Sequence, residues 1–151
     1  MTSIDTVRID DSDDWFRLFG AYLDFYETRL DRKTIEGAFA RIASPYMSLH
    51  GAIARDDNGR AVGLVHWLTH PATWTSTDYC YLEDLFVEPA ARNSGIGTAL
   101  IEHVQAWAQE HGSTKVYWLT AETNATARAL YDGLSQRSGM IQYQIPLRSP
   151  S

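Results

Sequence analysis

The sequence predicts one mixed α/β domain over residues 1–151, with the element order β-α-α-β-β-β-α-β-α-β. Asn58-Gly59 lies between two apolar runs, a pattern typical of a β-hairpin. Another strand-like run, Tyr79 to Val87, leads through a glycine-containing turn into a helix-like apolar spacing. These patterns indicate a mostly antiparallel sheet with one parallel crossover, flanked by helices.

The first half of the chain contains a short strand followed by two helices. We expect the strand over Ile4 to Ile9, and the aspartates after it are typical of a helix N-terminus. The first helix has a broad apolar stripe that begins at Trp15, and the second helix occupies Lys33 to Ile42. Both helices therefore have a face that can pack against a sheet.

The rest of the chain alternates strands and helices without a linker, repeat or low-complexity segment. A helix with apolar residues at spacings of three and four begins at Thr98. The other expected elements are strands over Ser48 to Arg55, Ala61 to Thr69 and Lys115 to Thr120, a helix over Ala125 to Leu134, and a closing strand over Ile141 to Leu147.

Composition and charge restrict the class of partner. A net charge of −6 argues against nucleic acid, which needs a basic face, and is compatible with a cationic small molecule. No apolar run is long enough to span a bilayer and no signal-peptide pattern is present, so we expect a cytoplasmic protein that does not insert in a membrane. Cys80 alternates with tyrosines as a strand residue does, and the five histidines lack metal-ligand spacing, so we expect no metal.

The turn between the strand and the helix that begins at Thr98 reads R-N-S-G-I-G from Arg92 to Gly97. A glycine turn that opens a helix presents unpaired N–H groups and the positive end of the helix dipole, which suits a phosphate. Arg92 adds a positive charge there. The Rossmann and P-loop patterns are both absent.

This R-x-x-G-x-G loop, after a strand that ends in V-x-P, resembles the coenzyme A pyrophosphate loop of the GNAT acetyltransferase superfamily. Asn93 stands where the family more often has glycine, and asparagine tolerates left-handed dihedrals. The resemblance implies the GNAT fold and acetyl-CoA as co-substrate. It implies that backbone groups of the strand pair with the pantetheine arm and that the loop holds the pyrophosphate, through Leu85, Phe86, Val87, Arg92, Asn93, Ser94, Gly95, Ile96, Gly97 and Thr98.

A second motif, N-x-x-A-x-x-L-Y, begins at Asn124 and also resembles the GNAT pattern. The resemblance implies that Asn124 and Ala127 help to hold the coenzyme and that Tyr131 gives a proton to the departing thiolate. Asn124 could equally be a helix N-cap. Tyr131 could equally be a core aromatic residue.

The strand Y-L-E-D-L-F-V resembles that of the spermidine/spermine (diamine) N-acetyltransferases. The resemblance makes Glu83 the acid that attracts the acceptor ammonium and takes its proton, with Asp84 structural or part of the charge environment. Strand alternation predicts that the two side chains point to opposite faces. An ion pair with Arg or Lys is the alternative for both acids. Tyr26 and Trp74 are further candidate substrate contacts.

The combined motifs predict an acetyl-CoA-dependent N-acetyltransferase that acts by direct transfer on a diamine, polyamine or lysine-like amine. One alternative is a GNAT enzyme acting on a protein N-terminus, a protein lysine or an aminoglycoside. Another is a non-catalytic acyl-CoA-binding module, which would need neither Glu83 nor Tyr131. A homodimer is implied by the resemblance alone.

Overall fold

The computed structural model describes residues 2–148, and the chain divides into two compact units, Met1–Leu119 and Thr120–Ser151. The second unit contains α4 (Ala125–Leu134). The first unit contains strands β1 (Ser3–Thr6), β2 (Leu49–Arg55), β3 (Ala61–Pro71), β4 (Asp78–Val87) and β5 (Ser113–Tyr117), and helices α1 (Ser12–Phe25), α2 (Arg32–Ala43) and α3 (Ile96–Glu110).

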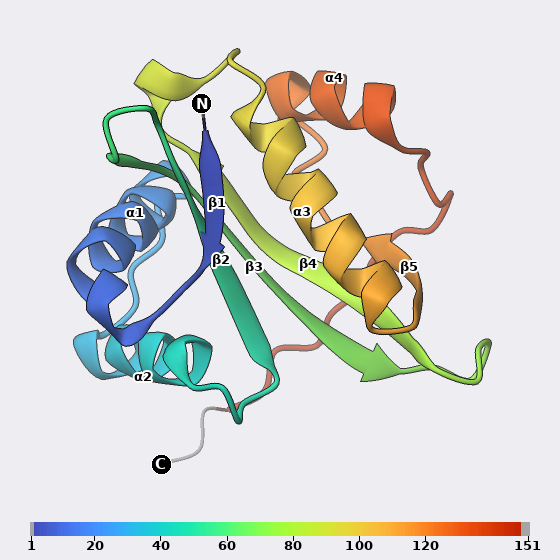
Figure 1. The fold of residues 1–151 in the computed structure, drawn as a ribbon. Coiled ribbons are helices and arrows are strands. Elements are labelled where there is room, and N and C mark those ends of the chain that lie inside the picture. Colours follow the sequence, from blue (N-terminus) through green and yellow to red (C-terminus); the bar gives the residue numbers. More distant parts are fainter. Residues whose placement is uncertain (1, 149–151) are drawn as a thin grey trace. The chain divides into compact units, whose positions relative to one another are not determined.

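The strands of the described residues form one sheet in the order β1-β2-β3-β4-β5, with the one parallel pair, β4 and β5, connected through α3 (Figure 1). The predicted meander and crossover are therefore confirmed. Pairing between β4 and β5 runs only as far as Tyr81, which lies opposite Tyr117. Beyond Tyr81, that edge of β4 has no strand partner within the described part of the chain.

Two glycines let helices approach the sheet closely. A Cβ on Gly51 would lie 2.7 Å from Ile42 of α2, and one on Gly63 would lie 3.1 Å from both Ile96 and Leu100 of α3. Alternation along β3 puts Gly63 on the opposite face from Leu64, which belongs to the core beneath α1 and α2. The sheet thus has α1 and α2 on one face and α3 on the other (Figure 1).

A β-bulge interrupts β4 at the two acids. Two consecutive residues of β3 pair with residues of β4 that are two apart: His66 pairs with Asp84, and Trp67 pairs with Leu82. Glu83 therefore has no partner of its own in the ladder. The expectation that Glu83 and Asp84 point to opposite faces is wrong, because a bulge breaks the strict alternation of a strand. Both acids act electrostatically on Tyr22 of α1, which places them in one neighbourhood.

The predicted closing strand over Ile141 to Leu147 is wrong. These residues have no regular secondary structure, and the apolar members of the alternation are exposed, with Tyr143 at 87% and Ile145 at 85%. Alternation alone does not make a strand, because a strand needs a partner for its backbone groups. The helix predicted over 125–134 has the expected bounds, and α3 begins two residues before Thr98. Within residues 2–148, no helix combines the length and apolar character that a membrane crossing needs.

Candidate active site

The glycine turn forms an open cradle at the start of α3. Gly95 is the N-cap residue, with φ 85°, and no side chain caps the helix. Asn93 also has a positive φ, of 64°, so it tolerates the left-handed conformation as expected. Nothing lies within 4 Å of the place where a Cβ on Gly95 would be. The start of α3 thus has no side-chain cap and is open beside Gly95, which is compatible with a pyrophosphate group at its first amides.

The guanidinium of Arg92 is held against the end of β4. Its Nε donates to the carbonyl oxygen of Val87 at 3.0 Å, and its Cζ lies 5.4 Å from the ring centroid of Phe25 and 6.0 Å from that of Phe86. Carbonyl and aromatic contacts of this kind favour a cation. The positive charge beside the loop is thus fixed in place by β4 and α1.

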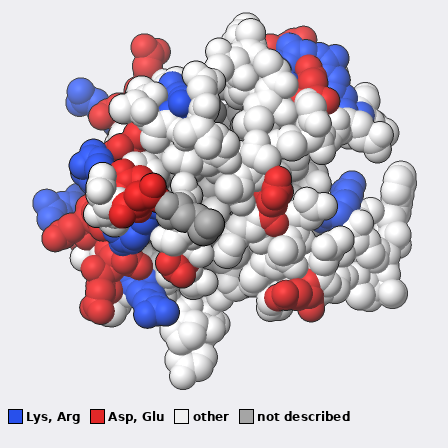
Figure 2. Space-filling model, turned by 45° about the horizontal axis from the view of Figure 1, so that its top comes forward, with Lys and Arg blue, Asp and Glu red and all other residues white. Residues whose placement is uncertain are grey.

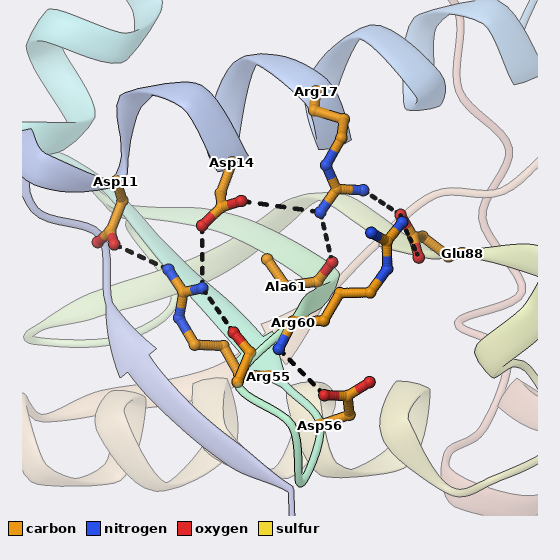
Figure 3. A network of polar contacts seen from close by, with 9 residues as sticks. Asp11, Asp14, Arg17, Arg55, Asp56, Arg60, Ala61 and Glu88 are labelled. Atoms are coloured by element: carbon orange, nitrogen blue, oxygen red, sulfur yellow. Dashed lines mark hydrogen bonds and ion pairs between the residues drawn. The ribbon is translucent and has the colours of Figure 1, made fainter.

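A network of ion pairs anchors the residue that follows β4. Glu88 accepts hydrogen bonds from Arg17 of α1 and from Arg60 of the β2–β3 turn, and Arg17 also donates to the carbonyl of Ala61 (Figure 3). Arg55 joins the same region to the start of α1 through Asp11 and Asp14. Figure 2 shows acidic and basic side chains interspersed on its left side. The end of β4 is therefore tied to two other elements just before the loop.

The carboxylate of Asp84 belongs to a buried hydrogen-bonded chain. Asp84 Oδ2 lies 2.9 Å from His66 Nδ1, and His66 Nε2 accepts a hydrogen bond of 2.9 Å from Trp15 Nε1. Trp15 is 0% exposed and His66 is 2% exposed. Burial raises the pKa of Tyr22, and so do the charge of Asp84 and a hydrogen bond to it. Tyr22 is therefore a protonated donor facing the same carboxylate.

Glu83 is exposed at the surface beside this chain. Partial burial raises its pKa, repulsion by Asp84 adds to the rise, and the positive charge of Arg41 opposes it, as would that of His66 if its ring were protonated. Because the side chain is exposed, water weakens both the burial effect and the repulsion by Asp84, without changing the direction of the pKa shift. A carboxylate with a raised pKa and room for a ligand can both attract a cation and accept its proton.

The other residues of the first unit that we predicted to contact the substrate or the coenzyme lie in different surroundings. Tyr26 lies 5.0 Å from Tyr22, ring to ring, and so adjoins the acids. Trp74 is 87% exposed, and its role as a substrate contact stays a prediction. The unpaired edge of β4 presents the backbone of Leu85, Phe86 and Val87, as pairing with an extended arm requires.

The second unit contains the other motif. Asn124 is the N-cap of α4, and its Oδ1 accepts a hydrogen bond of 3.2 Å from the amide of Ala127. The N-cap interpretation of Asn124 is thus confirmed, and its role toward the coenzyme stays a prediction. Tyr131 lies one turn before the end of α4, partly buried. Its role as proton donor also stays a prediction.

Sequence reasoning missed His66 and Trp15. His66 stands within the apolar run of β3, between Val65 and Trp67, and such a buried ionisable residue needs a polar partner. That signal was available, whereas the partner, Asp84, depends on the bulged register. Cys80 is buried, and burial raises its pKa to about 11, so it is a poor nucleophile.

An open helix start, an unpaired strand edge and two neighbouring acids are compatible with an enzyme that transfers an acyl group from a coenzyme thioester. The model of the acetyltransferase (GNAT) family matches residues 12–134, so the chain belongs to this family, whose members are N-acetyltransferases that use acetyl-CoA.

Three relatives illustrate the similarity. The D-amino-acid N-acetyltransferase HPA3 of Saccharomyces cerevisiae is 32% identical over 142 residues, which is 93% of this chain and 88% of the yeast protein. The structure of AAC(6')-Iy with the bisubstrate analogue CoA-S-monomethyl-acetylneamine has a TM-score of 0.84 at 18% identity, covering 98% of this chain and 99% of that one. A ribosomal-protein-alanine N-acetyltransferase of Brucella melitensis biovar Abortus 2308 has a TM-score of 0.81 at 20% identity, covering 97% and 100%. These structures confirm the fold.

Proposed function

We propose that this N-acetyltransferase acetylates the primary amine of a small cationic acceptor, such as a diamine, polyamine or lysine-like molecule. The observation that carries the proposal is the placement of two carboxylates, Glu83 and Asp84, in one electrostatic neighbourhood beside the bulge. Two adjacent negative charges attract an ammonium group more strongly than one does. The domain over residues 1–151, a homodimer and a cytoplasmic location accompany this proposal as predictions.

In the proposed mechanism, acetyl-CoA supplies the activated acetyl group. The acceptor binds as a cation, since amines of this kind have a pKa of about 10.4. Glu83 takes a proton from the ammonium, directly or through water, and the neutral nitrogen then attacks the acetyl carbonyl. Tyr131 gives a proton to the departing sulfur. The buried thiol of Cys80 forms no covalent intermediate.

The loop residues have a binding role in this mechanism. Amides from Gly95 to Thr98 hold the pyrophosphate at the start of α3, with Arg92 adding positive charge nearby. Backbone groups of the free β4 edge align the coenzyme arm, and one amide polarises the carbonyl. Orientation of both reactants can supply roughly 7–11 kcal/mol of the barrier reduction.

A second candidate acceptor is an amino acid, which carries a carboxylate as well as an ammonium. The similarity to a D-amino-acid N-acetyltransferase supports it. The positive charge of Arg41 acts on Glu83, so a cation is present near the acids for the acceptor carboxylate. Kinetics with diamines and with D- and L-amino acids of matched length distinguish the two candidates.

The test of the acid is Glu83→Gln, which keeps the shape and removes the charge. We expect a higher KM for diamines, a turnover lower by about 10²–10⁴-fold, and an unchanged affinity for acetyl-CoA. The wild-type rate should rise with pH as Glu83 and the amine lose protons. If Glu83→Gln lowers only the melting temperature and acetylates diamines with wild-type constants, Glu83 is a structural residue and the proposal is wrong.

A further inference from the structure

The hydrogen-bonded chain from Trp15 through His66 to Asp84 lies between α1 and the sheet. His66 stands at the centre, with its ring centroid 5.7 Å from Trp15 and 5.6 Å from Phe19. Gly51, opposite it on β2, leaves room for the imidazole, because a Cβ there would lie 3.1 Å from His66 Cδ2. With Trp15 and His66 almost fully buried, bulk water does not compete for their polar atoms.

The hydrogen bonds determine which nitrogen of His66 carries the proton. An indole N–H is a donor only, so Nε2 of His66, at 2.9 Å from Trp15 Nε1, must accept and carries no proton. The proton of the neutral ring is then on Nδ1, which donates to Asp84 Oδ2 at 2.9 Å. A second proton, on Nε2, would place the N–H of His66 directly opposite the N–H of Trp15. The chain of donors therefore runs in one direction and ends at a carboxylate.

Other groups face Asp84 from the neighbouring elements. Tyr22 of α1 has a pKa raised first by burial and then by the charge of Asp84, so its phenol keeps its proton beside this carboxylate. The other charged groups that face the site are Glu83 from β4 and Arg41 from α2. With His66 neutral, Asp84 is hydrogen-bonded without being neutralised by a cation on the imidazole. Two negative charges thus remain available to an acceptor ammonium.

We propose that Trp15 and His66 are positioning residues that fix Asp84 as an ionised carboxylate beside Glu83, a role that rests on the proposed cationic acceptor. The indole keeps a proton off Nε2, and the imidazole orients the carboxylate. Neither residue touches the reacting atoms. Protonation of His66 would place a positive charge where the acceptor needs a negative one.

The direct test is ¹⁵N NMR of the whole enzyme labelled at histidine. The shift pattern reports which ring nitrogen carries a proton and does not depend on activity. At neutral pH we expect the proton of His66 on Nδ1 and none on Nε2, as the two hydrogen bonds require. A wild-type His66 with its proton on Nε2, or with a proton on both ring nitrogens, would overturn the proposal.

Trp15→Phe removes the indole donor and keeps an aromatic ring. The matched control is Trp67→Phe, because Trp67 is equally buried and its Nε1 has no hydrogen-bond partner among the described residues. In Trp15→Phe, Nε2 of His66 becomes free to take a proton. At about pH 6 we expect kcat/KM for a diamine to fall roughly tenfold below that of the control and to recover toward pH 8, as one added charge near a bound cation would cause. Equal pH profiles of the two variants would contradict the proposal.

His66→Gln provides a second variant, since glutamine offers one donor and one acceptor and cannot be charged. We expect it to retain more diamine activity at about pH 6 than Trp15→Phe does, and the opposite order would contradict the proposal. The NMR result separates this proposal from the proposed function. An enzyme that acetylates no cationic amine but has the fixed Nδ1–H tautomer refutes the acceptor and supports the hydrogen-bonded chain. An active enzyme with a proton on Nε2 of His66 refutes only the chain.

Discussion

Replacement of Gly95 by alanine tests the coenzyme cradle most directly. Gly95 has φ 85°, and alanine in this left-handed conformation costs roughly 1–2 kcal/mol. No atom lies within 4 Å of the new methyl group, so the protein itself adds no steric clash. The free energy of unfolding should therefore fall by about 1 kcal/mol. If the substitution also weakens the binding of acetyl-CoA, the reason is that the coenzyme occupies the space that the new methyl group takes.

Gly59 provides the matched control for this substitution. It has φ 79° in the β2–β3 turn, and nothing lies within 4 Å of its Cβ position either. Gly59→Ala should cost the same stability and leave acetyl-CoA affinity unchanged. Gly95→Ala should weaken that affinity tenfold or more, which is about 1.4 kcal/mol of binding free energy. Gly95→Asp should weaken it further, because its charge repels phosphate.

Calorimetric titration with acetyl-CoA and urea unfolding of both variants supply the two measurements. The result that refutes the reasoning is an equal affinity in the folded Gly95→Ala and Gly59→Ala proteins. In that case the start of α3 is a tight turn without a ligand. An equal loss of affinity in both variants would likewise show that left-handed strain is responsible.

Two further predictions concern proton transfer and pH. Tyr131→Phe should keep acetyl-CoA affinity and reduce turnover by about 10²–10⁴-fold, as followed by thiol release, because only the phenol proton is lost; turnover at the wild-type rate would make Tyr131 a packing residue. The second prediction concerns two partly buried histidines. Burial lowers the pKa of His50, and the charge of His111 lowers it further. Burial also lowers the pKa of His103, although the charge of Asp5 opposes this shift. The unfolded chain therefore gains protons first as pH falls below about 6.5, and the free energy of unfolding should decrease there. Thermal melts from pH 8 to pH 5 should show this decrease, and His50→Gln with His103→Gln should reduce it; a slope unchanged by the double substitution would exclude these histidines as its cause.

Local signals in the sequence were sufficient for most of the fold. The hairpin at Asn58-Gly59, the crossover through α3 and the bounds of α4 depend on turn chemistry and apolar periodicity within short windows. The loop at Gly95 was recognisable because its two glycines, Gly95 and Gly97, lie within one short stretch that leads into a helix. The closing strand failed because pairing depends on a partner elsewhere, and the alternation from Ile141 carries no information about that partner.

The acid site was only partly predictable for the same reason. Glu83 and Asp84 were visible as acids in an apolar strand, but their orientation depends on the register between β3 and β4. That register is set by residues 18 positions apart, such as His66 and Asp84. The contact between Trp15 and His66 spans 51 positions. No pattern in a short window contains such distances.

The bulge has a consequence for how this scaffold could change over time. Leu82 and Asp84 pair with two consecutive residues of β3, so Glu83 is an extra residue between them. The two strands would pair in the same way without it. Glu83, to which we assign proton removal, is therefore not needed for the backbone pairing of its neighbours. Substitution there can alter what the enzyme accepts while the architecture stays intact. A proton-removing position that is independent of sheet pairing suits a fold whose members, by their names, acetylate amines as different as D-amino acids and ribosomal-protein alanine.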